Sequence, residues 1–166
     1  MNRRAFLGAT AMAGIAGAGL SKERDDMGKI DKAAIPDYDK WQLSDAEWKG
    51  RLSPEAYHVL RKEGTERAWT SPLNDEKRNG TFACAGCAYD LFSSAHKFDS
   101  GTGWPSFFDK LPNALAEKKD FKLILPRTEY HCARCGGHQG HVFNDGPSPT
   151  GLRYCNNGVA LAFRPA

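Results

Sequence analysis

The sequence predicts a mainly β domain of antiparallel sheets preceded by two short helices. Short apolar runs separated by Gly, Pro and Asn fill the chain beyond Thr65, which is typical of antiparallel strands and not of βαβ units. Helix-start signals are confined to residues 41–64. With 40% hydrophobic and 26% charged residues, the 166 residues are ordinary globular material, about one domain long.

The first 20 residues are predicted to be an export signal. They begin with Arg3 and Arg4 and continue with an uncharged Ala- and Gly-rich run that contains Ala-Gly-Ala at 16–18, typical of a twin-arginine signal. A transmembrane anchor needs roughly 20 strongly apolar residues, and this run is shorter and interrupted by glycines. We therefore expect a protein exported to the bacterial periplasm, with no stable membrane span.

Residues 21–40 are polar and of mixed charge, without a hydrophobic period, so we interpret them as a flexible linker. The folded domain is predicted to occupy residues 41–166. The formal net charge of +3 is small, and no run of Lys or Arg is present. Nucleic acid is therefore not an expected partner.

Two helices are predicted at the start of this domain. The first begins at a capping box of Ser44 and Glu47, whose side chains each satisfy a free N–H group at a helix start. The second begins at Ser53, which a proline follows at the first helical position, and ends near Gly64. One face of this second helix carries the apolar residues Ala56, Tyr57, Val59 and Leu60. We expect both helices to pack over the β domain.

Strands are predicted in four segments, at residues 80–92, 121–126, 136–145 and 152–163. Each is a short apolar run bounded by turn residues. One hydrophobic core can support a β domain of this size.

Four of the five cysteines form two Cys-x-x-Cys pairs, Cys84 with Cys87 and Cys132 with Cys135. Their four thiolates can converge tetrahedrally on one ion, as in structural zinc sites. Gly136 lets the backbone curl after the second pair so that amide groups point at sulfur. Two disulfides are the competing interpretation, which an export signal makes serious. The spacing favours one structural zinc ion per chain.

Cys155 has no partner among the other cysteines. Arg153 lies on the same strand face, where its charge would lower the pKa of the thiol. Asn156 and Asn157 offer amide groups that an inert buried thiol does not need. A buried structural thiol is nevertheless the most frequent state of a free cysteine. The local sequence leaves a nucleophile and a structural residue equally open.

Two histidines and a tryptophan add to the candidate site. His138 and His141, directly after the second cysteine pair, can carry protons near neutral pH. Structural histidines, or a metal site of their own, are the alternatives. Trp104 lies in a loop framed by Gly and Pro, and its face suits an apolar methyl group. Packing is the more frequent role of such a tryptophan.

Taken together, these segments resemble the peptide methionine sulfoxide reductases of the B type, which act on the R epimer. The matching segments are residues 97–107, 138–147 and 149–157, together with both cysteine pairs. The similarity extends in order over about residues 41–165. It implies a fold of two antiparallel β-sheets joined at a four-cysteine structural zinc site and flanked by short helices.

The resemblance also implies a role for each candidate residue. Cys155 would attack the sulfoxide sulfur, releasing methionine and becoming a sulfenic acid. His138, His141 and Asn157 would form the polar side of the site, where the histidines help to protonate the sulfoxide oxygen. Trp104 would hold the methionine methyl group. The partners would be oxidised proteins or peptides bearing methionine sulfoxide, and a thiol reductant.

The sequence departs from the family pattern at four positions. Thr102 stands where many relatives carry a resolving cysteine. With the other sulfurs on zinc, no internal disulfide would regenerate Cys155, so we expect a thioredoxin-like protein or a small thiol to attack the sulfenic acid. Gln139 and Asn156 replace apolar residues, and Gly158 replaces a common serine. These changes bear on rate and substrate preference more than on reaction type.

Two other classes of function remain open from the sequence. A non-catalytic, zinc-stabilised β binding module would need none of Cys155, His138 and His141. A cysteine hydrolase with a Cys-His dyad would need an oriented third residue and an oxyanion loop. The sequence shows neither of these.

Overall fold

The computed structural model describes residues 30–120 and 127–166. The predicted signal, the first part of the predicted linker and the predicted strand at 121–126 lie outside the described residues. Two antiparallel sheets and two α-helices make up the domain, which confirms the predicted mainly β class. Within the described ranges, no helix is long and apolar enough to cross a membrane.

The strands are short, and neighbouring strands within each sheet run antiparallel. In the described part of the chain they are β1 (Gly80–Cys84), β2 (Asp90–Ser93), β3 (Lys97–Phe98), β4 (Ser106–Phe107), β5 (Leu115–Asp120), β6 (Arg127–Cys132), β7 (His138–Phe143), β8 (Arg153–Asn156) and β9 (Leu161–Pro165). The predicted segments at 80–92, 136–145 and 152–163 contain β1, most of β2, all of β7 and β8, and the start of β9. The sequence did not predict β3, β4, β5 or β6.

In chain order, the strands of the larger sheet lie between those of the smaller one. The first sheet has the order β2–β1–β9, and the second has the order β3–β4–β8–β7–β6–β5. The last strand therefore returns to pair with the first, while β3 and β4, which follow β2 in the chain, join the second sheet. The first sheet therefore needs the first two strands and the last strand of the described chain.

Aromatic rings from both sheets form the centre of the core. Phe92 of the first sheet stacks on Phe107 of the second with ring centroids 4.2 Å apart, and Phe82 meets Phe107 edge-on at 4.9 Å. Tyr130 and Tyr154 also pack against Phe92, and all five residues are buried. Such ring pairs each add about 0.5–1.5 kcal/mol beyond burial of their area. They hold the two sheets face to face.

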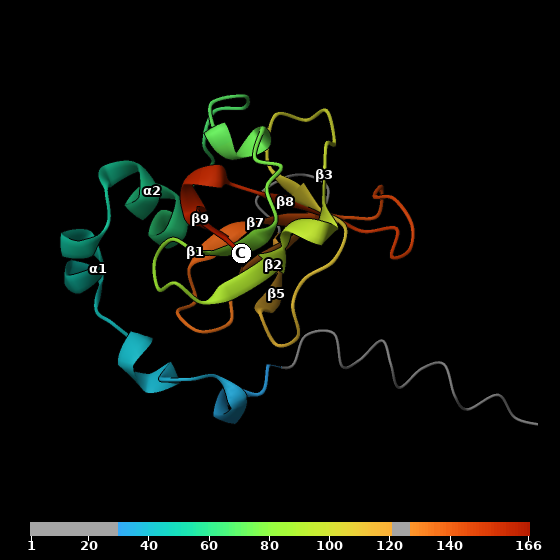
Figure 1. The fold of residues 1–166 in the computed structure, drawn as a ribbon. Coiled ribbons are helices and arrows are strands. Elements are labelled where there is room, and N and C mark those ends of the chain that lie inside the picture. Colours follow the sequence, from blue (N-terminus) through green and yellow to red (C-terminus); the bar gives the residue numbers. More distant parts are fainter. Residues whose placement is uncertain (1–29, 121–126) are drawn as a thin grey trace, which may run out of the picture.

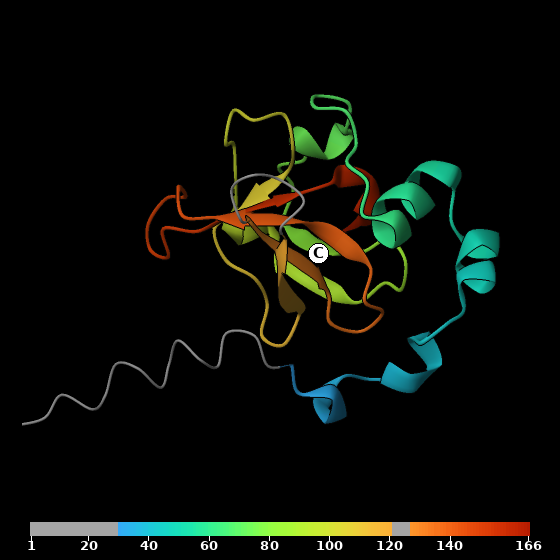
Figure 2. The same cartoon turned by 180° about the vertical axis from the view of Figure 1, so that it is seen from behind.

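The helices form where their start signals predict. Helix α1 spans Asp45–Arg51 and α2 spans Pro54–Lys62. The capping box is present, because the Ser44 hydroxyl accepts from the Glu47 backbone and the Glu47 carboxylate accepts from the Ser44 N–H group. Figures 1 and 2 show both helices on one side of the sheets. Helix α2 packs on β7 and on the 3-10 turn at Gly158–Ala160, so it braces the elements directly before and after Cys155's own strand in sequence.

Residues 30–41 lie against the domain. They contain two single turns of 3-10 helix, at Lys32–Ala34 and Tyr38–Trp41, and Ile35 between them is buried. Asp31 and Asn113 exchange two hydrogen bonds of 2.9 and 2.8 Å. The later part of the predicted linker therefore contacts the fold, and the domain boundary at residue 41 stays a prediction.

Candidate active site and metal centre

The four paired cysteines converge where the two sheets meet. Cys84 ends β1 and Cys87 lies in the turn that follows it, while Cys132 ends β6 and Cys135 lies in the turn before β7. The Sγ atoms of Cys84 and Cys135 are 3.7 Å apart, and those of Cys87 and Cys132 are 3.5 Å apart. All four sulfurs lie within 4.8 Å of one another, and all are buried and free of disulfides. This closed four-sulfur cluster is compatible with a structural metal site.

The backbone and the donor set both fit a tetrahedral ion. Zinc–sulfur bonds of about 2.3 Å place the sulfurs of a tetrahedron about 3.8 Å apart, close to the measured separations. After the first pair, the Ala88 N–H group donates to the Cys84 carbonyl at 2.8 Å; after the second, Gly136 donates to Cys132 at 2.9 Å. Ala88 and Gly136 share a left-handed backbone, with φ of 58° and 68°. Ala88 thus adopts the turn predicted to favour glycine.

Cys155 lines a small cavity together with three other predicted site residues. The cavity has a volume of about 130 Å³ and contains Cys155, Trp104, His141 and Asn157 in its wall. Asn156, whose amide the sequence also pointed to, lines the cavity as well. The lining residues that the sequence did not single out are Thr65, Arg127, Gly140 and Phe143. A larger cavity of about 650 Å³ lies beside α2 and contains none of the predicted site residues. The predicted site residues that line a cavity therefore gather at the smaller one.

Strand pairing fixes the neighbours of Cys155. This residue lies opposite His141 on β7 and opposite Ser106 on β4. Directly opposed residues of antiparallel strands share one face, so the thiol and the imidazole are neighbours. Gly140 precedes His141, and a Cβ atom there would lie 1.9 Å from the Cys155 carbonyl oxygen. Glycine is required at this position for the two strands to approach.

The resting state of Cys155 is a thiol. Burial raises the pKa of Cys155 above its ordinary value, and the positive charge of Arg153 and a hydrogen bond from Thr102 offset this only in part. Arg153 also donates to both carboxylate oxygens of Asp145, at 2.8 and 2.9 Å, and stacks on Phe143. Arg153 lowers the pKa of Cys155, as predicted, but burial raises that pKa by more.

Alkylation of Cys155 by iodoacetamide is expected to accelerate with pH up to a midpoint above about 8.5, the ordinary cysteine value, because only the thiolate reacts. Arg153→Met should move the midpoint to higher pH, since the nearby cation favours the thiolate. Arg164→Met, which removes an exposed arginine of β9, should leave the midpoint unchanged. Mass spectrometry of the Cys155 peptide measures the rate, and a wild-type midpoint below 8.5 would contradict this account.

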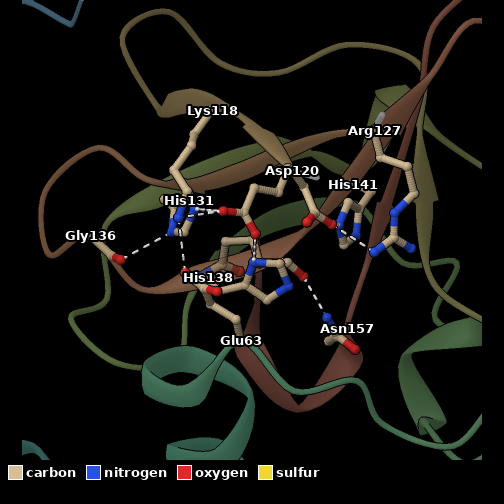
Figure 3. A network of polar contacts seen from close by, with 11 residues as sticks. Glu63, Lys118, Asp120, Arg127, His131, Gly136, His138, His141 and Asn157 are labelled. Carbon is tan, nitrogen blue, oxygen red and sulfur yellow. Dashed lines mark hydrogen bonds and ion pairs between the residues drawn. The ribbon is translucent and has the colours of Figure 1, made fainter. Parts of the chain in front are cut away.

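Asp120 and Arg127 orient His141 (Figure 3). The Nε2 atom of His141 lies 3.0 Å from Asp120 Oδ2, which also accepts a hydrogen bond from Arg127 at 2.7 Å. Burial lowers the pKa of His141, and the contact with Asp120 opposes this only in part. His141 is therefore a neutral base at pH 7, adjacent to a thiol that carries a proton.

His138 lies behind His141 and does not line the cavity. The two ring centroids are 5.5 Å apart, and only 1% of His138 is exposed. Residues three apart on a regular strand point to opposite faces, but the β6–β7 register shifts between these histidines and brings both rings to one side. Burial lowers the pKa of His138 to about 4, so this ring is neutral at pH 7.

Asn157 uses its whole side-chain amide within the protein. Its Oδ1 atom accepts from the Glu66 N–H group at 3.0 Å, and its Nδ2 atom donates to the Gln139 carbonyl at 2.9 Å. Trp104 is fixed in a similar way, because its indole N–H donates to the Glu66 carbonyl at 3.2 Å. Glu66 thereby connects two walls of the cavity.

Gln139 and Asn156, which replace apolar residues of the family pattern, contact each other. The Asn156 amide donates to Gln139 Oε1 at 3.4 Å and accepts from the Tyr130 hydroxyl at 2.9 Å. Gln139 in turn donates to the Cys84 sulfur at 3.3 Å. All of these side chains are buried. Hydrogen bonds thus connect Tyr130 on β6 through Asn156, which is on the same strand as Cys155, and Gln139 to a sulfur of the four-cysteine cluster.

Gln139→Leu and Asn156→Leu are each expected to lower the free energy of unfolding by about 1–3 kcal/mol, because each leaves buried polar partners unsatisfied. The double variant should lose less than the sum of the two, since both ends of the contact become apolar. Adding Tyr130→Phe should recover stability by removing the hydroxyl left without an acceptor. Urea denaturation measures all four variants, and strictly additive losses would rule out the coupling.

The fold and the site define a β protein whose two sheets meet at a cluster of four buried cysteines and whose fifth cysteine lies beside a histidine that a carboxylate orients. The model of the SelR domain family matches residues 52–165, so the chain belongs to this family. A curated relative in Thiobacillus denitrificans, "Peptide methionine sulfoxide reductase MsrB", is 54% identical over 123 residues, which cover 74% of this chain and 93% of that protein.

A second relative with the same name, from Agrobacterium fabrum, is 52% identical over 127 residues, or 76% of this chain and 94% of that protein. The family match spans every residue of the cavity wall and all four paired cysteines. These comparisons confirm the resemblance that the sequence motifs indicated.

Proposed function

We propose that this chain reduces R-configured methionine sulfoxide in peptides and proteins. The names of the curated relatives, which are about half identical to it, support this reaction. The observation that carries the proposal is the pairing of Cys155 with His141 in a cavity that Trp104 also lines. A nucleophile, a proton carrier and an apolar wall lie together there, which is the combination that a sulfoxide needs.

In the proposed reaction, His141 accepts the Cys155 proton and the thiolate attacks the sulfoxide sulfur. This attack forms a bond between the two sulfurs. That bond and the sulfoxide sulfur–oxygen bond then break as the oxygen bonds to the Cys155 sulfur, which becomes a sulfenic acid, and methionine leaves. The sulfoxide sulfur gains two electrons and the cysteine sulfur loses two. The proton from the Cys155 thiol ends on the transferred oxygen. A cysteine that rests as a thiol therefore brings the proton that the sulfenic acid needs. Asp120 stabilises the imidazolium that forms on His141.

Different walls of the cavity would bind the apolar and the polar parts of the substrate. Trp104 and Phe143 provide apolar surface for the methyl group and the side-chain methylenes. His141 lies on the polar side, where the sulfoxide oxygen has to be placed. His138 packs against His141 from behind and positions its ring. Asn157 acts through the backbone that it holds in place.

The four-cysteine site would hold one zinc ion. When bound, zinc supplies a structural cross-link between the two sheets and no reactive position, because all four of its ligands come from the protein. Cys84, Cys87, Cys132 and Cys135 are the ligands, and the Gln139 amide helps to neutralise the thiolate of Cys84.

We propose that an external thiol or a thioredoxin-like protein regenerates Cys155, since its neighbour at residue 102 is a threonine. Wild-type enzyme treated with one equivalent of sulfoxide should show a gain of one oxygen on Cys155 and no internal disulfide. Thr102→Cys should instead form a disulfide with Cys155, and Thr102→Ser is the matched control. Intact and peptide mass spectrometry measure these products, and a Cys155 disulfide in the wild type would contradict the proposal.

Turnover of separated R and S sulfoxide peptides with dithiothreitol tests the reaction. We expect reduction of the R epimer alone, measured by chromatography of the methionine product. No turnover of either epimer by zinc-loaded protein would refute the function, and preference for the S epimer would refute the assignment of the cavity walls.

A cysteine hydrolase is the second candidate, because Asp120 supplies the oriented third residue that the sequence did not show. Family membership favours the reductase. A non-catalytic binding module does not account for a thiol next to an oriented histidine. Assaying the same protein for peptide and ester hydrolysis separates these functions.

We also propose that residues 1–20 export the protein after it has folded and bound zinc in the reducing cytoplasm. A version exported unfolded by another route should then contain less zinc per chain. Unchanged zinc content would contradict this order of events.

A further inference from the structure

A second group of metal-ligand side chains lies between β6 and β7, separate from the four cysteines. Glu129, His131 and His138 each place a carboxylate oxygen or an imidazole nitrogen within 4.8 Å of the others. The Nε2 atom of His131 is 3.2 Å from Glu129 Oε1, and the Nδ1 atom of His138 is 3.5 Å from Glu129 Oε2. His131 and His138 are also opposite each other in the strand register.

The ring of His131 is oriented like that of a metal ligand. Its Nδ1 atom lies 3.2 Å from the Gly136 carbonyl oxygen, which can only accept, so this nitrogen carries a hydrogen (Figure 3). In the neutral ring the lone pair is then on Nε2, facing the carboxylate of Glu129. Two acceptors face each other stably only when a proton or a cation lies between them. Metal-bound histidines typically donate their other N–H group to a backbone carbonyl in this way.

His138 gives independent evidence for a ligand. It is 1% exposed, and neither of its ring nitrogens makes a hydrogen bond to any described residue. Buried polar side chains are rarely left in this state, because each unsatisfied group costs about 1–3 kcal/mol. The rings of His131 and His138 are 5.5 Å apart at their centroids. One ion bound to Glu129 and His131 could also be reached by His138.

Two competing contacts bear on the choice of ligands. Lys118 lies 2.6 Å from Glu129 Oε1, but its side chain is 57% exposed and can move into solvent. Asp120, Glu129 and His141 form an overlapping group, in which Asp120 is already bonded to Arg127. The unsatisfied His138 therefore favours the first group.

We propose that Glu129, His131 and His138 bind one divalent transition-metal ion that takes nitrogen ligands, such as Zn²⁺ or Ni²⁺. Two imidazoles with one carboxylate suit these ions, whereas Mg²⁺ and Ca²⁺ prefer oxygen ligands alone. Binding at this site does not depend on the reductase function. One consequence does rest on that function: an ion on His138 would alter the support of His141, so the loaded enzyme should turn over more slowly.

Titration of tag-free, full-length protein with Ni²⁺ tests the site. The protein should first hold one zinc per chain, and Cys155→Ser should be present to remove the accessible thiol. Calorimetry and elemental analysis should then show one further ion per chain. His131→Asn and Glu129→Gln should each weaken its binding by more than about tenfold. His58→Asn, which removes an exposed histidine of α2, should leave it unchanged.

Zinc content and thermal melting show whether each variant is folded. If only one of His131→Asn and Glu129→Gln folds, that variant alone tests whether these residues bind the ion. Absence of a second equivalent in the parent protein would overturn the proposal. Equal affinity in the parent and in a folded ligand variant would overturn it as well. Because the readout is binding, these outcomes are distinct from failure of the sulfoxide assay.

Discussion

Cys155→Ser is expected to abolish turnover of a methionine sulfoxide peptide, with a loss of at least about 10³-fold, because the serine hydroxyl cannot replace the thiolate as nucleophile. The sulfenic acid would disappear along with the activity, since no other described cysteine faces the cavity. Chromatography of the product with dithiothreitol as reductant measures the rate. Persistent reductase activity in this variant would refute the role of Cys155.

The same variant should keep its fold, which separates loss of chemistry from loss of structure. Cys155 is half-buried and contributes nothing to the four-sulfur site, so zinc content and melting temperature should match the wild type. His58→Asn serves as the activity control, because this exposed histidine lies on α2 and outside the active-site cavity. A binding module would show no turnover in any of these proteins.

Cys132→Ser is expected to have the largest effect on stability. The Cys132 side chain is fully buried between the sheets, and its sulfur is 3.5 Å from that of Cys87. Structural zinc sites supply about 10–16 kcal/mol of apparent binding free energy to small domains, so the loss of one of four ligands should remove more than about 3 kcal/mol of unfolding free energy. Urea denaturation and zinc analysis measure the change.

Chelation of the wild-type protein should reproduce this loss, and added zinc should reverse it. Cys155→Ser is the matched control, because it changes the same type of side chain outside the metal site. If metal-free and zinc-loaded wild-type protein unfolded at the same urea concentration, the four-sulfur site would have no structural role.

The sequence predicted those parts of the fold that depend on residues close together in the chain. The capping box at Ser44, the Ser53 start of α2 and the two Cys-x-x-Cys turns all formed as expected. The strands β3 and β4 were not predicted, because two-residue strands carry no alternation; β4 forms by pairing with β8, and β3 by pairing with β4. Their partner is distant in the chain, which no short window of sequence records.

In the candidate site, too, residues recognisable by their type were predicted, and residues that depend on distant strand pairing were not. Cys155, His141 and Trp104 were found because their residue types are unusual in such loops and strands. Asp120 was not predicted as a site residue. Its partner His141 is 21 residues away in the chain and becomes its neighbour only through the β5–β6–β7 register. The departure at Gly158 has a tertiary cause too, because a Cβ atom there would lie 1.9 Å from the Ser71 hydroxyl.

The interleaved strand order makes the domain indivisible. A cut between β4 and β5 would leave the first sheet without β9 in one piece and the second sheet without β3 and β4 in the other. Each piece would also carry only one of the two cysteine pairs. Neither half is a module that could be duplicated or shuffled alone, so recombination in evolution or in the laboratory has to move this unit whole.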